Sequence, residues 1–498
     1  MGAVTIAEAI DIESKALANG WTVEQLLNLA GERLGHAISR FYPCPGTIVG
    51  YLGKGHNAGD ALVALRILRD NYGWKIFART AQALEAFAPL TLKKWDELGL
   101  RAPLDRPFDP QDCQRPLVLL DGLLGSGASG SIREPLLTLA REMTTLRQTC
   151  GARIAAVDLP SGIDPDLGKI FPNTVTADIT FMIGNAKRGL LTASATNATG
   201  SLALVAVAPL VARVHGDREL ISPQTTDFGK SPRPFDFHKG MAGRVAIVAG
   251  SATYTGAAVL AASGALRGGA GLVTLYVPDS IHQIVASKCP PEVIVRRFEN
   301  ASQVLASRYD AIVVGCGLGS LAEALSLEIL ELISESACPV VIDADALNVI
   351  AASHSLEILT ADHLVTPHPG EFARLAPDLA ELPREEAARE FAARTPATLL
   401  LKGCRTLITR KGAALWSNST GTPAMASGGQ GDVLAGVIGA RIASGENPME
   451  AAMISAWACG RSAEIALNTG HASEDTLLPT DVLHFLGEAF QDWRTSGR

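Results

Sequence analysis

The alternation of apolar runs and amphipathic stretches divides the chain into two series of strands and helices. Residues 3–40 carry apolar positions at helical spacing and predict two amphipathic helices. From Thr47 onward, short apolar runs alternate with helical stretches. The runs are TIVGYL, WKIFA, PLVLLD and RIAAVD, followed by ADITFMI and SLALVAVA. Strands that alternate with helices in this way predict a parallel sheet with helices on both faces.

A second series of strands and helices begins after residue 240. Its strands are expected at RVAIVAG, GLVTLYV, DAIVVG, PVVIDAD, HLVTP and ATLLLKG, followed by a hairpin, RTLITR–KGAALWS, with Lys411-Gly412 at its turn. Helices at about 430–443 and 448–468 close the chain. Residues 214–240 lack periodicity and are rich in Pro and charge, which predicts a linker. We therefore expect two domains, residues 1–217 and 225–498, each with a three-layer αβα fold.

Composition narrows the class of protein. The chain has 498 residues, of which 47% are hydrophobic, so each half can bury its own core. The net charge of −8 and the lack of a basic run argue against nucleic acid or an anionic membrane as a partner. The acidic start has no signal-peptide pattern, and the uncharged stretches are interrupted by Gly, Ser, Thr, Asn or Pro. Eight scattered cysteines without a C-x-x-C pair predict buried free thiols and a cytoplasmic protein.

Three motifs of the first half each follow a predicted strand, where ligands bind in a doubly wound sheet. GKGHNAGDALVAL leads a glycine-rich turn into a helix whose free amides can hold phosphate; the alternative is an ordinary turn capped by Asn57. DGLLGSGASG and DLPSGIDPDLG place Asp121 and Asp158 at the mouth of one sheet. Asn57, Asp121 and Ser161 are hard oxygen ligands for a cation, which leaves Asp158 for acid–base work. In the alternative interpretation these aspartates only cap helices or turns.

Together these motifs resemble the NAD(P)HX epimerase family over residues 1–215, and the resemblance implies a Rossmann-like fold. It implies that Asn57, Asp121 and Ser161 hold K⁺ and that Asp158 contacts the hydrated nicotinamide and transfers its proton. It also implies two dinucleotide-binding loops, formed by His56, Asn57, Ala58, Gly59 and Asp60 and by Gly125, Ser126, Gly127, Ala128, Ser129, Gly130 and Ser131. The first motif departs from the family pattern at His56, Ala58 and Ala61. The alanines add only methyl groups, which fit where φ is negative, whereas His56 changes a ligand-facing donor.

The strongest motif of the second half is ASGGQGDVLAGVIGA, Ala426–Ala440. Gly428, Gly429 and Gly431 let the backbone approach a phosphate at the positive end of the following helix. Asp432 in the first turn can accept the proton of an attacking hydroxyl group. The alternative is a helix that merely starts with glycines and is stabilised by an N-terminal Asp.

This G-x-G-D pattern resembles the ribokinase-like superfamily. With HKGMAGRVAIVAGS, VVGCGLG, VIDADALN, TPHPGEFARL and LKGCRT it is similar to the ADP-dependent NAD(P)HX dehydratases over residues 225–498. The resemblance implies that Lys402, Gly403, Cys404, Arg405 and Thr406 line the nucleotide together with Gly431, and that amides around Gly429 hold its phosphates. It also implies that Asp432, His368, Gly319, Gly256 and Ala257 line the hydrated cofactor. His368 has an alternative role as a capping residue of the helix that follows it.

The two resemblances imply one repair reaction. The first half interconverts the R and S hydrates of NADH and NADPH, and the second half dehydrates the S hydrate at the expense of ADP, giving AMP and phosphate. K⁺, ADP and Mg²⁺ are the implied cofactors, NADHX and NADPHX the substrates, and we expect a homo-oligomer. Two alternative functions remain open, one for each half of the chain. The second half could be a hydroxymethylpyrimidine or thiazole kinase, and the first half could be a non-catalytic binding module.

Overall fold

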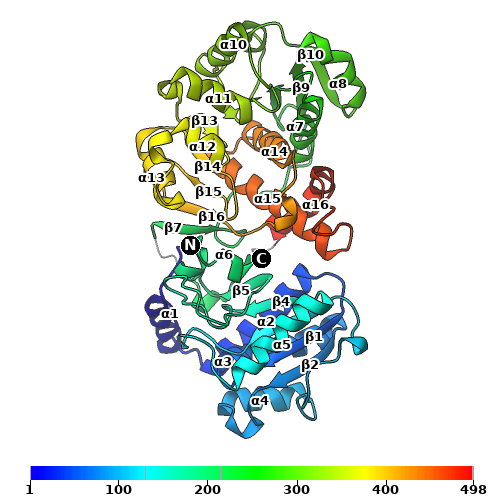
Figure 1. Ribbon diagram of the computed structural model, residues 1–498, viewed down its shortest axis with the longest axis vertical. Helices are drawn as coiled ribbons and strands as arrows, with labels where there is room; N and C mark the ends of the chain where they lie inside the picture. The colour runs from blue at the N-terminus through cyan, green and yellow to red at the C-terminus, as the bar shows by residue number, and fades with distance from the viewer. Residues whose placement is uncertain (1, 129, 213–215, 496–498) are drawn as a thin grey trace. The chain divides into compact units, whose positions relative to one another are not determined.

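The computed structural model describes residues 2–128, 130–212 and 216–495, and the chain divides into two compact units, Met1–Gln224 and Thr225–Arg498. Each unit consists of a sheet between layers of helices (Figure 1). The unit boundary lies close to the expected domain boundary. Within the described ranges no helix combines the length and the hydropathy that a membrane span requires.

The sheet of the first unit is parallel throughout and has the strand order β2-β1-β3-β4-β5-β6. Its chain reverses direction across the sheet between β1 and β3, which creates a crevice at the carboxyl ends of these strands. The strands are β1 (Thr47–Leu52), β2 (Lys75–Thr80), β3 (Leu117–Gly122), β4 (Arg153–Val157), β5 (Ile179–Ile183) and β6 (Ser201–Val205), and the short β7 (Arg218–Ile221) comes later in the chain.

The helices of the first unit begin and end where local chemistry favours it. Thr5 and Thr22 each form a capping box that starts a helix, and Gly73, Gly99 and Gly151 end others in the left-handed conformation. The helices are α1 (Ile6–Ala18), α2 (Val23–Phe41), α3 (His56–Tyr72), α4 (Pro89–Leu98), α5 (Leu136–Cys150) and α6 (Thr196–Thr199).

Strand residues of the first sheet alternate between two cores. Ile48 and Leu52 lie with α2, α3 and α4 on one face, whereas Val49 and Tyr51 lie with α5 on the other. This period of two is what places helices on both faces of the sheet. The predicted αβα architecture is therefore confirmed for this unit.

In the second unit the strands run in the order β10-β9-β8-β11-β12-β13-β14-β15-β16, parallel up to β14 and antiparallel from β14 to β16. The predicted hairpin is present, with Gly412 at φ 76° in its turn. The strands are β8 (Arg244–Val248), β9 (Leu272–Val277), β10 (Val293–Arg297), β11 (Ala311–Val314), β12 (Val340–Ile342), β13 (His363–Val365), β14 (Thr398–Leu401), β15 (Leu407–Thr409) and β16 (Leu415–Asn418).

Glycines allow two helices on one face of this sheet to approach closely. A Cβ at Gly436 would lie 2.0 Å from the Ala261 carbonyl oxygen, and one at Gly264 would lie 2.4 Å from the Val433 carbonyl oxygen. The helices of the unit are α7 (Thr255–Gly268), α8 (His282–Lys288), α9 (Ala301–Leu305), α10 (Glu323–Ser334), α11 (Ala344–Ser353), α12 (Pro369–Leu375), α13 (Arg384–Arg394), α14 (Gln430–Ala443), α15 (Pro448–Asn468) and α16 (Pro479–Thr495). The α7–α14 contact thus depends on the absence of side chains, and it fixes the start of α14.

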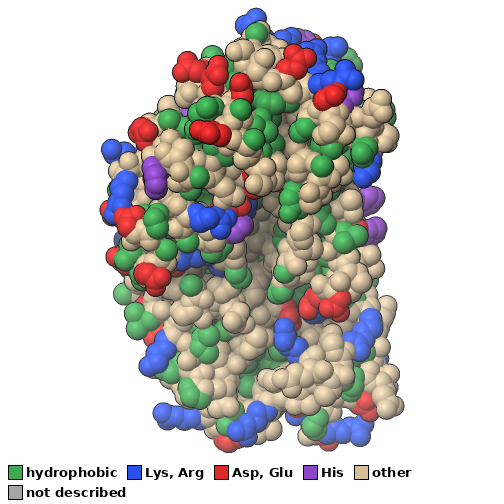
Figure 2. Space-filling model, turned by 45° about the horizontal axis from the view of Figure 1, so that its top comes forward, with side chains coloured by type: hydrophobic (Ala, Val, Ile, Leu, Met, Phe, Trp, Pro, Cys, Tyr) green, Lys and Arg blue, Asp and Glu red, His purple; other side chains and the backbone are tan. Residues whose placement is uncertain are grey.

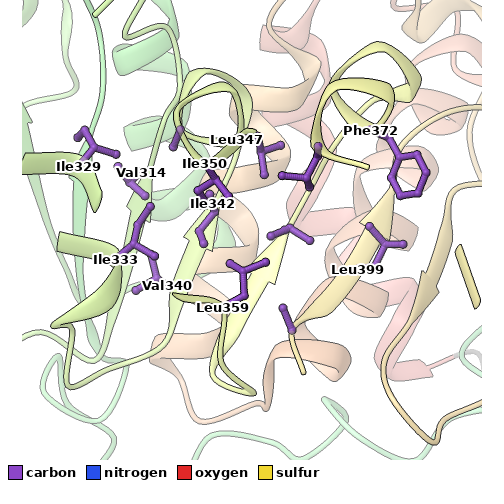
Figure 3. Packing of buried hydrophobic residues seen from close by; sticks show 14 of the residues in the cluster. Val314, Ile329, Ile333, Val340, Ile342, Leu347, Ile350, Leu359, Phe372 and Leu399 are labelled. Carbon is purple, nitrogen blue, oxygen red and sulfur yellow. The ribbon is translucent and has the colours of Figure 1, made fainter. Parts of the chain in front are cut away.

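The opposite face of the second sheet packs against α10 to α13. Figure 3 shows Val314, Val340 and Ile342 of the strands meeting Ile333 and Ile350 of the helices in one apolar layer. All five side chains are at most 2% exposed. This layer holds the loops that follow β11, β12 and β13 at a common edge.

Three features differ from the sequence-based expectations or were not predicted. The segment expected to be a linker is partly packed, since Trp493 Nε1 donates to the Phe228 carbonyl oxygen at 3.1 Å. The expectation of buried thiols is wrong for Cys44 and Cys404, which are exposed. The pattern analysis also missed β10 and the helices α8, α9, α11, α13 and α16. Apolar periodicity is weak in short or Ala- and Glu-rich segments such as α9 and α13, whereas α16 was missed although its apolar positions follow helical spacing.

Candidate active sites

A cavity of about 620 Å³ opens at the carboxyl ends of the first sheet. Residues from both predicted dinucleotide loops and from the end of β4 line it together. They are His56, Asn57, Asp60, Gly125, Ser126, Gly127, Ala128 and Asp158. Ala58, Gly59, Gly130 and Ser131 do not line the cavity, and Ser129 lies outside the described residues.

The start of α3 presents backbone amides to this cavity. The N-cap is Gly55, which has no side chain to bond the first amides, so the alternative in which Asn57 caps the helix is wrong. Asn57 instead donates from Nδ2 to the Leu124 carbonyl oxygen at 2.9 Å. Ala58 and Ala61 are buried in the helix with negative φ, as their methyl groups require. The helix start therefore keeps free amides and the positive end of its dipole for an anionic group.

Asp121 lies fully buried beneath the cavity. Its carboxylate accepts the Ser161 amide at 2.8 Å, the Ser161 hydroxyl at 2.7 Å and the Leu123 amide at 3.2 Å. Burial raises the pKa of Asp121 to about 6, against the lowering effect of these hydrogen bonds. Ser161 Oγ also accepts the Leu124 amide at 3.0 Å, so the side chains of Asn57, Asp121 and Ser161 all contact the loop Leu123–Leu124. No cationic side chain of the described residues forms an ion pair with Asp121.

Asp158 stands at the end of β4 with a left-handed backbone, φ 65°, a conformation that is rare outside glycine. Its Oδ1 atom accepts the Ile183 amide at 3.0 Å and a short hydrogen bond from Lys187 Nζ. Lys187 is only 4% exposed and lines the cavity. Its ammonium group neutralises Asp158 at the wall of the cavity.

The second candidate site lies where α14 begins beside the ends of β11, β12 and β13. Asp432 is in the first turn of α14, with Gly429 at its N-cap in the left-handed conformation. Burial, reinforced by the neighbouring Asp343 carboxylate, raises the pKa of Asp432 to about 7. A carboxylate poised near neutral pH at a helix N-terminus is suited to act as a general base.

Lys402 provides the positive charge of this site. Its Nζ atom donates to Asp343 Oδ1 at 2.6 Å and lies 3.6 Å from Glu371 Oε2. The same Nζ atom would lie 3.4 Å from a Cβ at Gly431, so the ammonium group faces the start of α14. Burial lowers the pKa of Lys402, but the charges of Asp343 and Glu371 outweigh it and raise the pKa overall.

Arg384 of α13 fixes the loop that follows Lys402. Its guanidinium donates to four backbone carbonyl oxygens, at 2.6 Å to Cys404, 2.7 Å to Leu401, 3.1 Å to Lys402 and 3.2 Å to Arg405. The loop needs this support because Gly403 has φ 138° and Arg405 has φ 54°. The predicted nucleotide loop is thus held in one conformation from behind.

The remaining predicted residues of the second unit are His368, Gly319, Gly256 and Ala257. His368 Nδ1 caps α12 by accepting the Gly370 amide at 3.0 Å, so the capping alternative describes its geometry, while half of its ring stays exposed. Gly319, φ 74°, donates its amide to Asp345 Oδ2 at 2.7 Å. Gly256 and Ala257 lie in the first turn of α7, where Gly256 has open space beside it.

Figure 2 shows a hollowed face with Lys or Arg, Asp or Glu, and His side chains at its edge.

Sequence reasoning missed several residues of the two sites. Lys187 lies in no motif, and only its closeness in sequence to β5 could have pointed to the crevice. Asp343 stands inside VIDADALN, and its place directly after β12 is the same pattern that singled out Asp121 and Asp158. Arg384 could not have been found, since it acts through backbone carbonyls of a distant segment.

Two family models match the chain. Residues 245–485 match the model described as NAD(P)H-hydrate dehydratase, and residues 23–189 match the model described as YjeF-related protein N-terminus.

Curated relatives match nearly the whole chain. The bifunctional NAD(P)H-hydrate repair enzyme of Gloeobacter violaceus is 36% identical over 481 residues, covering 91% of this chain and 91% of the relative. The enzyme of the same name from Synechocystis is 31% identical over 517 residues, covering 98% of this chain and 95% of the relative. These matches span both units.

A ribokinase-like superfamily protein from Enterococcus faecalis resembles part of the chain in structure. The TM-score is 0.50 at 24% identity, and the match covers 57% of this chain and 98% of that protein. The likeness confirms the ribokinase-like fold that was expected for the second half.

Proposed function

The chain belongs to the family of bifunctional NAD(P)H-hydrate repair enzymes, and we propose that its second unit performs the ADP-dependent dehydration and its first unit the epimerisation. The observation that carries the assignment is Asp432, a carboxyl group with a pKa of about 7 in the first turn of α14. A site of this kind is built to remove a proton from a hydroxyl group beside a phosphate.

In the dehydratase, Asp432 takes the proton from the C6 hydroxyl of the S hydrate as its oxygen attacks the β-phosphorus of ADP. AMP leaves, and the hydroxyl becomes a phosphate ester. Loss of phosphate from C6 and of a proton from C5 restores the C5–C6 double bond. Phosphorylation is needed because hydroxide is a poor leaving group and phosphate is a good one.

Several groups around α14 support a bound nucleotide. The amides near Gly429 and Gly431 and the Lys402 ammonium group would stabilise its phosphates, and the loop Lys402–Thr406 would line its nucleoside. Mg²⁺ would bind mainly through the phosphates, because no group of three His, Cys, Asp or Glu side chains in the described ranges is arranged as a metal cage. Mg²⁺ would offset the charge that develops on the transferred phosphoryl group.

In the epimerase, the loop after β3 and the start of α3 would hold the dinucleotide, with Asp158 at the hydrated nicotinamide. Asn57, Asp121 and Ser161 would hold K⁺. Their chemistry fits a cation, because Asp121 is a buried carboxylate with no cationic side chain of the described residues against it, the Ser161 hydroxyl oxygen lies 2.7 Å from it, and Asn57 bonds to the loop that follows it. K⁺ would share Asp121 with the hydrogen bonds from Ser161, and it would order the loop Leu123–Gly125.

The two alternatives of other classes can be weighed against these observations. A vitamin-precursor kinase does not account for curated relatives that match both units under one repair-enzyme name. A non-catalytic first unit does not account for the cavity in which Asp60, Asp158 and Lys187 converge. We also propose that the enzyme works in the cytoplasm as a homo-oligomer on NADHX and NADPHX; the free cysteines support a reducing compartment.

The test is incubation of the full chain with mixed R and S hydrates and either ADP or ATP, followed by the absorbance of reduced nicotinamide. We expect complete recovery of both hydrates, faster with ADP. Fast recovery of the S fraction alone, with the R fraction recovered no faster than spontaneous epimerisation allows, would contradict the epimerase assignment. No recovery with either nucleotide would contradict the dehydratase assignment.

A further inference from the structure

Asp60 is the one acidic side chain of α3 that lines the epimerase cavity. The family resemblance implies that it contacts the dinucleotide and gives it no catalytic role. Among the described residues no group donates a hydrogen bond to its carboxyl, in contrast to Asp158 on the neighbouring wall. The charged and titratable groups that share this cavity are Glu13 of α1, Lys54, His56, Asp158 and Lys187.

The surroundings of the two carboxyl groups differ in charge and in hydrogen bonding. Burial, the charge of Asp158 and the charge of Glu13 raise the pKa of Asp60 well above its usual range, and Lys187 lowers it only in part. Asp158 receives the Lys187 ammonium group and the Ile183 amide directly, and both stabilise a carboxylate. Within one cavity, Asp60 is therefore shifted toward its neutral form while Asp158 is paired with a cation, an arrangement that suits an acid and its matching base.

The substrate of the proposed epimerase needs such a pair. Carbon C6 of the hydrate carries the hydroxyl group and is bonded to the ring nitrogen N1. Protonation of the hydroxyl lets the C6–O bond break while the N1 electron pair forms a C6=N1 bond, and water leaves. Water then adds to the other face of C6, its proton passes to a base, and the electron pair returns to N1. The net change is inversion at C6, with no oxidation and no other reactant.

We propose that Asp60 is the general acid and Asp158 the general base of this exchange, with Lys187 as the positioning residue that pairs with Asp158 and orients it. The inference rests on the proposed epimerase function and deepens it. Asp60 gives its proton to the departing hydroxyl and Asp158 takes a proton from the incoming water. Water in the cavity returns that proton from Asp158 to Asp60, so that both groups are restored after each inversion. For the opposite inversion the two groups exchange roles.

The experiment follows two readouts on the full chain without ADP. The R hydrate of NADH is incubated in H₂¹⁸O, and the S hydrate formed and the ¹⁸O in its hydroxyl group are measured by chromatography and mass spectrometry. The wild-type protein should incorporate one solvent oxygen for each inversion. Asp60→Asn should slow inversion and oxygen exchange together by at least about 100-fold, the size expected when a general acid is lost.

Controls separate this outcome from unfolding and from failure of the proposed function. Asp60→Asn should still bind the R hydrate in calorimetry within about threefold of wild type, and it should dehydrate the S hydrate with ADP at the normal rate. Asp96→Asn, an exposed position on α4, is the matched control and should leave inversion unchanged. Lys187→Met should slow inversion and shift its pH profile, whereas Lys187→Arg should restore part of the rate.

Three results would overturn the proposal. Near-normal inversion by Asp60→Asn would show that Asp60 is not the acid. Inversion by the wild-type protein without ¹⁸O in the product would show that the C6–O bond stays intact. A wild-type protein that dehydrates the S hydrate but does not accelerate inversion would remove the epimerase function itself, a result that differs from the first two because in both of those the wild-type protein still inverts C6.

Discussion

Dehydration of the S hydrate should depend steeply on pH because of Asp432. An Asp in water has a pKa of 3.8, and burial together with the nearby Asp343 raises the pKa of Asp432 to about 7. A general base works only when it is ionised, so activity should rise as pH rises through this value. With a pKa of about 7, about one tenth of the protein carries the carboxylate at pH 6 and about nine tenths at pH 8.

The assay is kcat for the S hydrate at saturating ADP between pH 5 and 9, with ADP affinity measured by calorimetry over the same range. We expect kcat to fall by about tenfold for each pH unit below about 7, while ADP affinity changes little. Asp432→Asn should lose about 100- to 10,000-fold in kcat at pH 8. The backbone amides at the start of α14 still hold the phosphates in this variant, so ADP should bind about as well as before.

Two results would refute the reasoning. A kcat that stays constant from pH 8 down to pH 5 would show that Asp432 is ionised throughout and that burial does not control it. Near-normal turnover by Asp432→Asn would show that Asp432 only stabilises the helix N-terminus and that the base lies elsewhere. Conversion of the R hydrate to the S hydrate, measured in the same samples without ADP, should be unaffected by the substitution.

Further predictions concern the cation, the two units and the packing of α14. Replacing K⁺ by a bulky organic cation should lower epimerisation at least about tenfold without changing dehydration, because K⁺ would neutralise the buried Asp121 carboxylate; equal rates would contradict the site. A fragment of residues 225–498 should dehydrate the S hydrate and leave the R hydrate to spontaneous epimerisation, and a folded but inactive fragment would contradict independence. Gly436→Ala should lower the free energy of unfolding by about 1–3 kcal/mol through overpacking, whereas the exposed Gly487→Ala on α16, with open space around it, should not lower it; the check is chemical denaturation of both variants.

Much of the fold followed from local pattern. Apart from β10, the strands from Thr47 to Val205 and from Arg244 to Leu401 lie close to where apolar runs placed them, because a buried parallel strand needs a nearly continuous apolar run. The glycine-rich segments marked the ends of strands for the same local reason, since close turns into helices need small residues. Short helices such as α11 and α13 were not predicted, because tertiary packing stabilises them and their own periodicity does not.

The candidate sites were only partly predictable. The sequence by itself determined that Asp121, Asp158 and Asp432 stand at strand ends or at a helix start, since those positions depend on neighbouring residues alone. Only the tertiary structure decided that Lys187 reaches Asp158 and that Lys402 reaches Asp343 across 59 positions of the chain. The protonation state of each carboxyl group depends on burial and on charges contributed by other elements, and neither can be computed from the order of residues before the sheets are assembled.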